Sequence, residues 1–187
     1  KKMSLYTQTN KEFIRYFSKF IFETEIHNQY YDTEGKLINN ELNNNSYYKF
    51  FPIASLSLET PFKIKNNDIT YKPNVSIIIS SGQSNSNKLS NEESTNNTYN
   101  ISTQSELNRY TGTDKLDNSK RIKYGMNIYK SDLQINLSQN YEFTQNSNYH
   151  KETGNYDYLS DALGELIYTT ENNKIDYSLR DRQSAAA

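Results

Sequence analysis

The stretch that decides the fold runs from residue 121 to residue 143 and reads RIKYGMNIYKSDLQINLSQNYEF. Apolar and polar residues alternate through both halves of it, and Lys130-Ser131 lies between the halves. A period of two residues is typical of a β-strand with one apolar and one polar face. The stretch therefore predicts two antiparallel strands that are joined by a tight turn.

The same alternation predicts further strands on both sides of this pair. It is clear at residues 69–79 and looser at residues 11–26, 46–59, 158–169 and 173–181. Helical spacing is not sustained in any stretch, and several candidates are longer than the usual globular strand. We therefore expect an all-β, antiparallel fold of about seven strands.

The links between the expected strands are alternately long and short. Long polar links, rich in Asn and Ser, are expected at residues 26–46, 81–117 and 145–157. Short links are expected around Pro61, at Lys130-Ser131 and at residues 171–173. Outer-membrane β-barrels have this asymmetry, because their periplasmic turns are short and their extracellular loops are long. The sequence therefore predicts a transmembrane β-barrel whose long links lie outside the cell.

The composition also favours a barrel over a soluble core. Hydrophobic residues make up only 34 % of the chain, yet it contains 17 Tyr and 8 Phe. This balance suits barrel strands, since only the lipid face must be apolar and aromatic residues form girdles at its borders. A net charge of -1 argues against a basic surface for nucleic acid, and the absence of Cys excludes disulfides and thiolate sites within the chain.

The strand count predicts that the chain is a piece of a larger barrel. Seven strands do not make a closed, even-numbered barrel, and an open sheet edge cannot face lipid. The beginning of the chain also lacks the apolar segment of a signal peptide. We therefore expect residues 1–182 to be part of a barrel domain and residues 183–187 to be a tail.

One long motif resembles the C-terminal barrel region of the LptD family, which assembles lipopolysaccharide at the outer membrane. It is SELNRYTGTDKLDNSKRIKYGMNI, at residues 105–128, and it is similar to the family pattern LNRFSGYDR followed by R.NYGL. The matching residues are Leu107, Asn108, Arg109, Tyr110, Gly112, Asp114, Arg121, Tyr124 and Gly125. The chain departs from the pattern at Thr113, where the family has an aromatic residue, and at Lys115, where it usually has Arg.

Other motifs resemble the same family and follow its order. Residues 61–81 look like the strand pair that precedes the motif LSNEES, at residues 89–94, which is similar to the IPNEDS of alphaproteobacterial members. LQINLSQNYEF, at residues 133–143, resembles a later strand, with Ser138 in place of a Gly. YLSDALGEL, at residues 158–166, is similar to the family's SD.VGRL pattern. Its matching residues are Ser160, Asp161, Gly164 and Leu166.

The resemblance implies transport rather than enzymatic chemistry, and it implies no cofactor. LptD proteins lie in the outer membrane of Gram-negative bacteria, receive lipopolysaccharide from a periplasmic bridge of Lpt proteins and release it laterally into the outer leaflet. A lipoprotein, LptE, plugs the barrel. The implied partners are therefore lipopolysaccharide, an LptE-like lipoprotein, the periplasmic bridge and outer-membrane lipid, and nucleic acid is not among them. The chain would supply wall strands and extracellular loops.

Charged residues in and beside the longest link have competing interpretations. Arg109 and Asp114 would fold the link inward as a lid over the lumen, or the link is a surface loop held by hydrogen bonds. Arg121 and Lys123 alternate with an apolar face, so we expect them to point into the lumen. Contact with lipid A phosphates is one interpretation there. Pairing with lumenal carboxylates such as Glu142 is favoured over it.

The remaining polar residues predict no catalytic or metal site. His27 and His150 are both expected in or near loops, without the further ligands that a metal needs. Glu92-Glu93 would bind divalent ions at the cell surface or, as we favour, form a solvated acidic loop. The chain also lacks a nucleophile elbow and a phosphate-binding glycine loop.

Two alternatives to an LptD-like transporter remain at this stage. A porin or another small-molecule channel would show the same alternation without the ordered motifs. A soluble, adhesin-like β-domain with Asn-rich loops would share the strands but would not depend on a membrane.

Overall fold

The computed structural model describes residues 2–38, 41–65, 68–81, 94, 100–143, 158–170 and 174–181. These residues form one antiparallel sheet and one short helix. The strands are β1 (Lys2–Arg15), β2 (Ser18–Ile38), β3 (Glu41–Glu59), β4 (Phe62–Ile64), β5 (Ile69–Ser80), β6 (Lys120–Lys130), β7 (Leu133–Glu142), β8 (Ala162–Thr169) and β9 (Lys174–Asp181), and the helix is α1 (Ile101–Ser105). The prediction of an all-β, antiparallel fold is confirmed.

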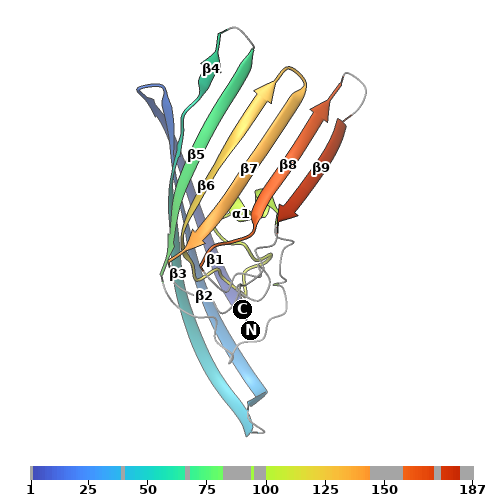
Figure 1. Ribbon diagram of the computed structural model, residues 1–187. Coiled ribbons are helices and arrows are strands. Elements are labelled where there is room, and N and C mark those ends of the chain that lie inside the picture. The colour runs from blue at the N-terminus through green and yellow to red at the C-terminus, as the bar shows by residue number, and fades with distance from the viewer. Residues whose placement is uncertain are drawn as a thin grey trace.

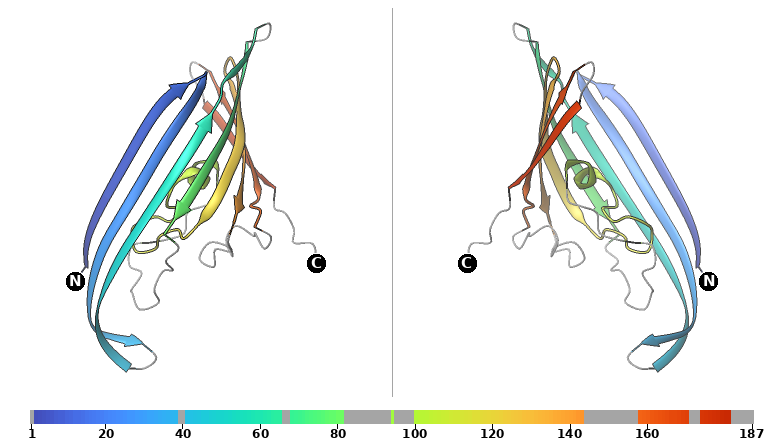
Figure 2. Two further views of the ribbon diagram at one scale, coloured as in Figure 1. Left: turned by 90° about the vertical axis from the view of Figure 1, so that its left-hand side faces the viewer. Right: turned by 90° about the vertical axis from the view of Figure 1, so that its right-hand side faces the viewer.

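The sheet is open and strongly curved (Figure 1). Its strand order is β1-β2-β3-β5-β6-β7-β8-β9, with the short β4 paired to β5, so β1 and β9 form its two edges. Two side views show that α1 and the residues after it lie on the concave side (Figure 2). Among the described residues, no helix is long and apolar enough to cross a membrane.

The sheet has nine strands where the alternation predicts about seven, and one reason is the turn between β1 and β2. The stretch at residues 11–26 was predicted as one strand, but β1 ends at Arg15 and β2 begins at Ser18. Tyr16 and Phe17 form the turn between them with φ angles of 49° and 68°. Such turns normally use Asn or Gly, which tolerate positive φ. Two aromatic residues are not typical of a turn, so the sequence did not predict this hairpin.

The prediction of a long polar link at residues 26–46 is wrong. Strand β2 continues to Ile38 and β3 already begins at Glu41. The two strands pair along this region, with one irregularity between Thr33 and Lys36, and form a hairpin that projects beyond the rest of the sheet (Figure 1). Backbone hydrogen bonds do not depend on side-chain polarity, so an Asn-rich segment can still be a strand pair.

The other connections keep the predicted asymmetry. The connection from β5 to β6 spans residues 81–119 and that from β7 to β8 spans residues 143–161. Both leave the sheet at the end where the chain termini lie, whereas the hairpin turns at the opposite end are short (Figure 1). We call these two ends of the sheet the loop end and the turn end.

The convex face is apolar, because residues of the same phase are neighbours across successive strands. One row crosses five strands at Phe22, Leu56, Ile77, Ile122 and Tyr141. Another, nearer the turn end, crosses Tyr71, Ile128, Ile135, Leu166 and Tyr177. Side chains such as Leu56, at 47 % exposure, are not covered by any described part of the chain. This face is far larger than the scattered apolar residues of an ordinary surface.

Candidate functional site

A segment of the long β5–β6 connection crosses the concave face, and we call residues 100–119 the strap (Figure 2). The strap begins with α1, whose N-cap is Asn100. The Asn100 Oδ1 accepts a hydrogen bond of 2.9 Å from the Thr103 amide, and Thr103 Oγ1 accepts one of 3.1 Å from the Asn100 amide. This reciprocal capping box orders the short helix where it meets the sheet.

Apolar contacts seat the middle of the strap. Leu107 and Leu116 are buried and pack in one cluster with Phe51, Ile53 and Ile78 of β3 and β5. These three sheet residues have the phase of the concave face, which is otherwise mainly polar. Burial of a large apolar side chain contributes about 1.5–3 kcal/mol. The strap is therefore held by a small hydrophobic core and not by polar contacts alone.

A group of buried charges lies beside this core, and we call it the ion cluster: Arg109, Asp117, Arg121 and Glu142. The Arg109 Nε and Nη2 lie 2.5 and 3.2 Å from the two Asp117 carboxylate oxygens. Arg121 Nη1 donates to Asp117 Oδ2 at 3.0 Å, and Arg109 Nη2 lies 2.6 Å from Glu142 Oε1. Ser119 Oγ donates to Glu142 Oε2 at 2.6 Å.

Among the residues that the structure describes, the ion cluster is balanced, with two guanidinium groups and two carboxylates. Arg109, Asp117 and Arg121 are all at most 1 % exposed. Removing one member of such a group leaves an uncompensated buried charge, which costs about 3–5 kcal/mol. The cluster therefore fixes where the strap lies on the sheet.

The sequence suggested that Arg121 pairs with Glu142, and the structure changes this pairing. Arg121 and Glu142 are partners in the β6–β7 register. The strap inserts Asp117 between the charges, so Arg121 binds Asp117 while Glu142 binds Arg109. Arg121 keeps no exposed surface for a lipid phosphate. Lys123 lies on the concave side of the sheet, and its Nζ contacts Ser105 Oγ of α1.

In addition to the ion cluster, which is the first anchor of the strap, a second anchor joins the strap to β1 and β2. Asp114 Oδ1 lies 2.7 Å from Lys2 Nζ and accepts a hydrogen bond of 3.2 Å from the Tyr31 hydroxyl. Gln29 Nε2 donates to the Thr113 carbonyl at 2.6 Å. Because Lys2 and Tyr31 come from adjacent strands near one edge of the sheet, this anchor fixes one end of the strap.

A third anchor lies on β7 and β8, at the other side of the concave face. Gln104 is fully buried, accepts a hydrogen bond from the Ser138 hydroxyl and donates to Ser160 Oγ at 3.5 Å. Tyr110 packs against Leu163 in a second apolar cluster. The strap is therefore attached to seven strands, namely β1, β2, β3, β5, β6, β7 and β8.

The predicted motif residues Asn108 and Gly112 shape the strap itself. Asn108 Oδ1 accepts hydrogen bonds from the Asp117 amide at 3.0 Å and from the Tyr110 amide at 3.4 Å. Its Nδ2 donates to the Gly112 carbonyl at 3.4 Å. Gly112 has a φ of 74°, which glycine adopts without the steric cost that other residues incur.

The predicted residues Tyr124, Gly125 and Gly164 lie in the wall, outside the strap. Tyr124 is on the convex face, where its hydroxyl donates to Gln139 Oε1 at 2.6 Å. A Cβ on Gly125 would collide with the Leu137 carbonyl of the adjacent strand. A Cβ on Gly164 would make ordinary contacts, 3.6 Å from Leu137 Cδ2. Gly125 is therefore required by close strand approach, and Gly164 is not.

The last predicted pair, Ser160 and Asp161, fixes the entry to β8. Ser160 Oγ accepts a hydrogen bond of 2.8 Å from the Asn140 amide. Asp161 is buried, and its Oδ2 lies 2.5 Å from Arg180 Nε of β9. This ion pair ties the end of β9 to the start of β8.

Sequence reasoning missed Asp117, Gln104 and the apolar seat. A signal for the seat was present: Phe51, Ile53 and Ile78 are apolar at positions where the alternation requires a polar residue. The prediction that His27 lies in or near a loop is wrong, because His27 is a buried residue in the middle of β2. His150 and Glu92-Glu93 lie outside the described residues, as does most of the LSNEES motif.

An open, acidic groove lies between α1 and strands β1 and β2. Its volume is about 470 Å³, and Glu23, Glu25 and Glu106 contribute carboxylates to its lining. Burial, and secondarily the charge of Glu25, raise the pKa of Glu106 above its usual value. Within the described part of the chain, no three His, Asp or Glu side chains are grouped so that they could hold a metal ion.

Comparison with known proteins assigns no identity to the chain, since no family model and no curated protein matches its sequence.

Proposed function

We propose that the chain forms part of the wall of an outer-membrane β-barrel of the LptD kind, and that it acts in lipopolysaccharide transport to the outer leaflet. The observation that carries the proposal is the contrast between the two faces of one curved sheet. The convex face has registered apolar rows, whereas the concave face is mainly polar and carries the strap. A barrel wall between lipid and an aqueous lumen needs this contrast.

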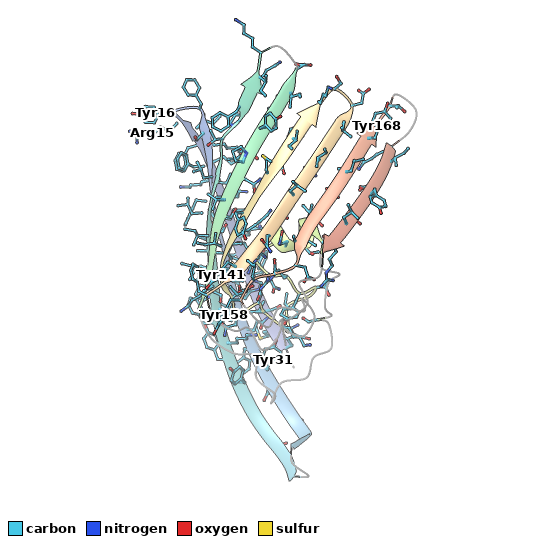
Figure 3. The ribbon with its side chains drawn as sticks, viewed as in Figure 1. Arg15, Tyr16, Tyr31, Tyr141, Tyr158 and Tyr168 are labelled. Carbon is cyan, nitrogen blue, oxygen red and sulfur yellow. The ribbon has the colours of Figure 1, made fainter. Side chains whose placement is uncertain are left out.

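Aromatic side chains border the convex face at both ends of the strands. Tyr141 and Tyr158 lie near the loop end, and Tyr16 and Tyr168 lie near the turn end (Figure 3). Strand β7 covers the distance between these levels in nine residues, from Leu133 to Tyr141, which is about 27 Å along the strand and about 20 Å in height at a tilt of about 40°. This height is slightly less than the apolar band of outer-membrane barrels, which is about 25 Å tall and is enclosed by aromatic girdles.

The orientation follows from the connections. In outer-membrane barrels the long loops face outward, so the loop end of the sheet would be extracellular. The strap would then lie inside the lumen, near its extracellular opening, as an inward-folded lid. An unpaired strand edge cannot face lipid, so further strands would pair with β1 and β9 to complete the barrel.

The assignment to lipopolysaccharide transport rests on the family resemblance. The matched residues Leu107, Arg109, Asp114 and Arg121 are those that seat the strap on the wall. The resemblance therefore concerns a particular device, a lid held by a buried ion cluster, and not only a pattern of strands. The proposed partners are lipopolysaccharide, an LptE-like plug lipoprotein and the periplasmic Lpt bridge.

Depletion of the protein in the cells that make it tests this proposal. We expect newly made lipopolysaccharide to disappear from the cell surface and to accumulate at the inner membrane. Normal delivery of lipopolysaccharide, combined with slower uptake of small solutes, would instead identify a porin. Recovery of the protein in the soluble fraction after removal of membranes would contradict any barrel.

A further inference from the structure

We propose that a hollow on the convex face binds one acyl chain of a membrane lipid. The inference rests on the membrane location proposed above and adds a defined lipid site to it. The hollow has a volume of about 550 Å³ and lies over β5, β6, β7 and β8. Its convex-face lining includes Pro73, Tyr124, Met126, Leu137, Gln139 and Ala162.

The shape of the hollow follows from side-chain sizes in the register. Pro73, Met126 and Leu137 are neighbours in one row across β5, β6 and β7. The short side chains of Pro73 and Ala162 border the longer ones of Met126 and Leu137, which leaves a depression in an otherwise even apolar face. Met126 is flexible and can adjust to an irregular hydrocarbon chain.

One end of the hollow is polar. The Tyr124 hydroxyl donates to Gln139 Oε1 at 2.6 Å, and Gln139 Nε2 donates to the Ser160 carbonyl at 2.9 Å. This pair lies toward the loop end, two residues along β7 from Tyr141 of the aromatic border. Met126 and Leu137 lie on the opposite side, toward the middle of the proposed membrane. Polarity therefore falls from the border inward.

An acyl lipid has the same polarity, with an ester or amide group near the membrane border and hydrocarbon below it. One N–H of the Gln139 side chain is directed to Ser160. Its second N–H can donate to the carbonyl of the lipid's ester or amide group. A volume of about 550 Å³ is within the range of small-molecule sites. A transmembrane helix is a different possible occupant of an apolar hollow. Such a helix is about 10 Å in diameter and would need a long groove.

Photo-crosslinking in a bilayer tests the site. The complete barrel that contains this chain would be reconstituted in vesicles of phosphatidylethanolamine and phosphatidylglycerol that contain a phosphatidylcholine with a diazirine in its acyl chain. After illumination, labelled residues would be mapped by mass spectrometry. We expect Met126 and Leu137 to be labelled roughly fivefold more than Leu56 and Ile77, although these two residues of the same face are about as exposed as Leu137 and more exposed than Met126.

Ala162→Phe, which fills the hollow from the convex side, should remove this enrichment. Ala54→Phe is the matched control, because Ala54 is also on the convex face but outside the hollow. The wild-type map decides the question even if Ala162→Phe does not fold. Even labelling over the convex face would overturn the acyl site and leave the membrane wall intact. Labelling confined to the concave face, or none, would overturn both.

Discussion

The carboxylate of Asp117 in the strap lies 3.0 Å from the guanidinium group of Arg121 in β6, and neither side chain is exposed to solvent. The two residues are only four positions apart in the chain. Between them the chain leaves the strap and enters the wall, so this ion pair fixes the point at which a loop becomes a strand. The orientation of the strap therefore depends on the first residues of β6.

Asp117→Asn should release the strap. The change leaves two buried guanidinium groups with one carboxylate, and we expect a loss of about 3–5 kcal/mol in stability. Thermal unfolding of the detergent-solubilised protein and limited proteolysis of residues 100–119 would measure it. Asp68→Asn is the control, since the Lys63–Asp68 pair is exposed and should contribute little. Equal effects of the two substitutions would show that the ion cluster does not hold the strap.

Leu116→Ala should weaken the apolar seat. Leu116 is fully buried against β3 and β5, and truncation of such a residue typically costs about 2–5 kcal/mol. Leu179→Ala, on the convex face with 59 % exposure, removes the same atoms without opening a cavity. Faster proteolysis within the strap for the first variant only is the expected result. Unchanged protection of the strap in Leu116→Ala would contradict the seat.

The two wall glycines should respond differently to alanine. Gly125→Ala forces a Cβ against the Leu137 carbonyl, and we expect a loss of about 1–3 kcal/mol as β6 and β7 separate. Gly164→Ala places its Cβ at ordinary contact distance and should be neutral or stabilising. Thermal unfolding of both variants in the same detergent compares them directly. A Gly125→Ala variant as stable as wild type would show that the strands have room at this position.

Glu106→Gln should remove a loss of folding stability that grows as the pH rises. The pKa of Glu106 is raised in the folded protein above its ordinary value of 4.5, first by burial and then by Glu25. The folded state therefore holds the proton more tightly than the unfolded state, and stability falls as the pH rises from about 4.5 through the raised pKa. We expect the variant to gain stability over wild type across this interval. Exposed Glu34→Gln, titrated in parallel, accounts for the change in net charge, and a gain that shrinks with pH would contradict the raised pKa.

The sequence predicted those strands that face two different environments. In β5, β6 and β7 the apolar phase is regular, so alternation alone located them to within a few residues. It failed at Tyr16-Phe17, where the backbone adopts positive φ without Gly or Asn, and in the β2–β3 hairpin, where an Asn-rich segment pairs through its backbone.

The site was less predictable than the fold. Motif residues such as Arg109 and Asp114 could be selected, but their partners Glu142 and Lys2 are more than thirty positions away in the chain. Pairing over such distances depends on strand register and on the path of the strap, which local sequence does not encode. Apolar residues in the polar phase of a strand were the one available sign that something docks on that face.

Water accessibility of successive β5 positions tests the two-faced wall most directly. The chain has no Cys, so Cys introduced singly at Asn74, Val75, Ser76 or Ile77 would be the only thiol it contributes. In outer-membrane vesicles that have been made permeable to a small, water-soluble maleimide, we predict labelling at positions 74 and 76 and protection at positions 75 and 77. Unfolding of the protein in a denaturing detergent should abolish the protection. Equal labelling at all four positions in the membrane would contradict the account of this sheet as a barrel wall.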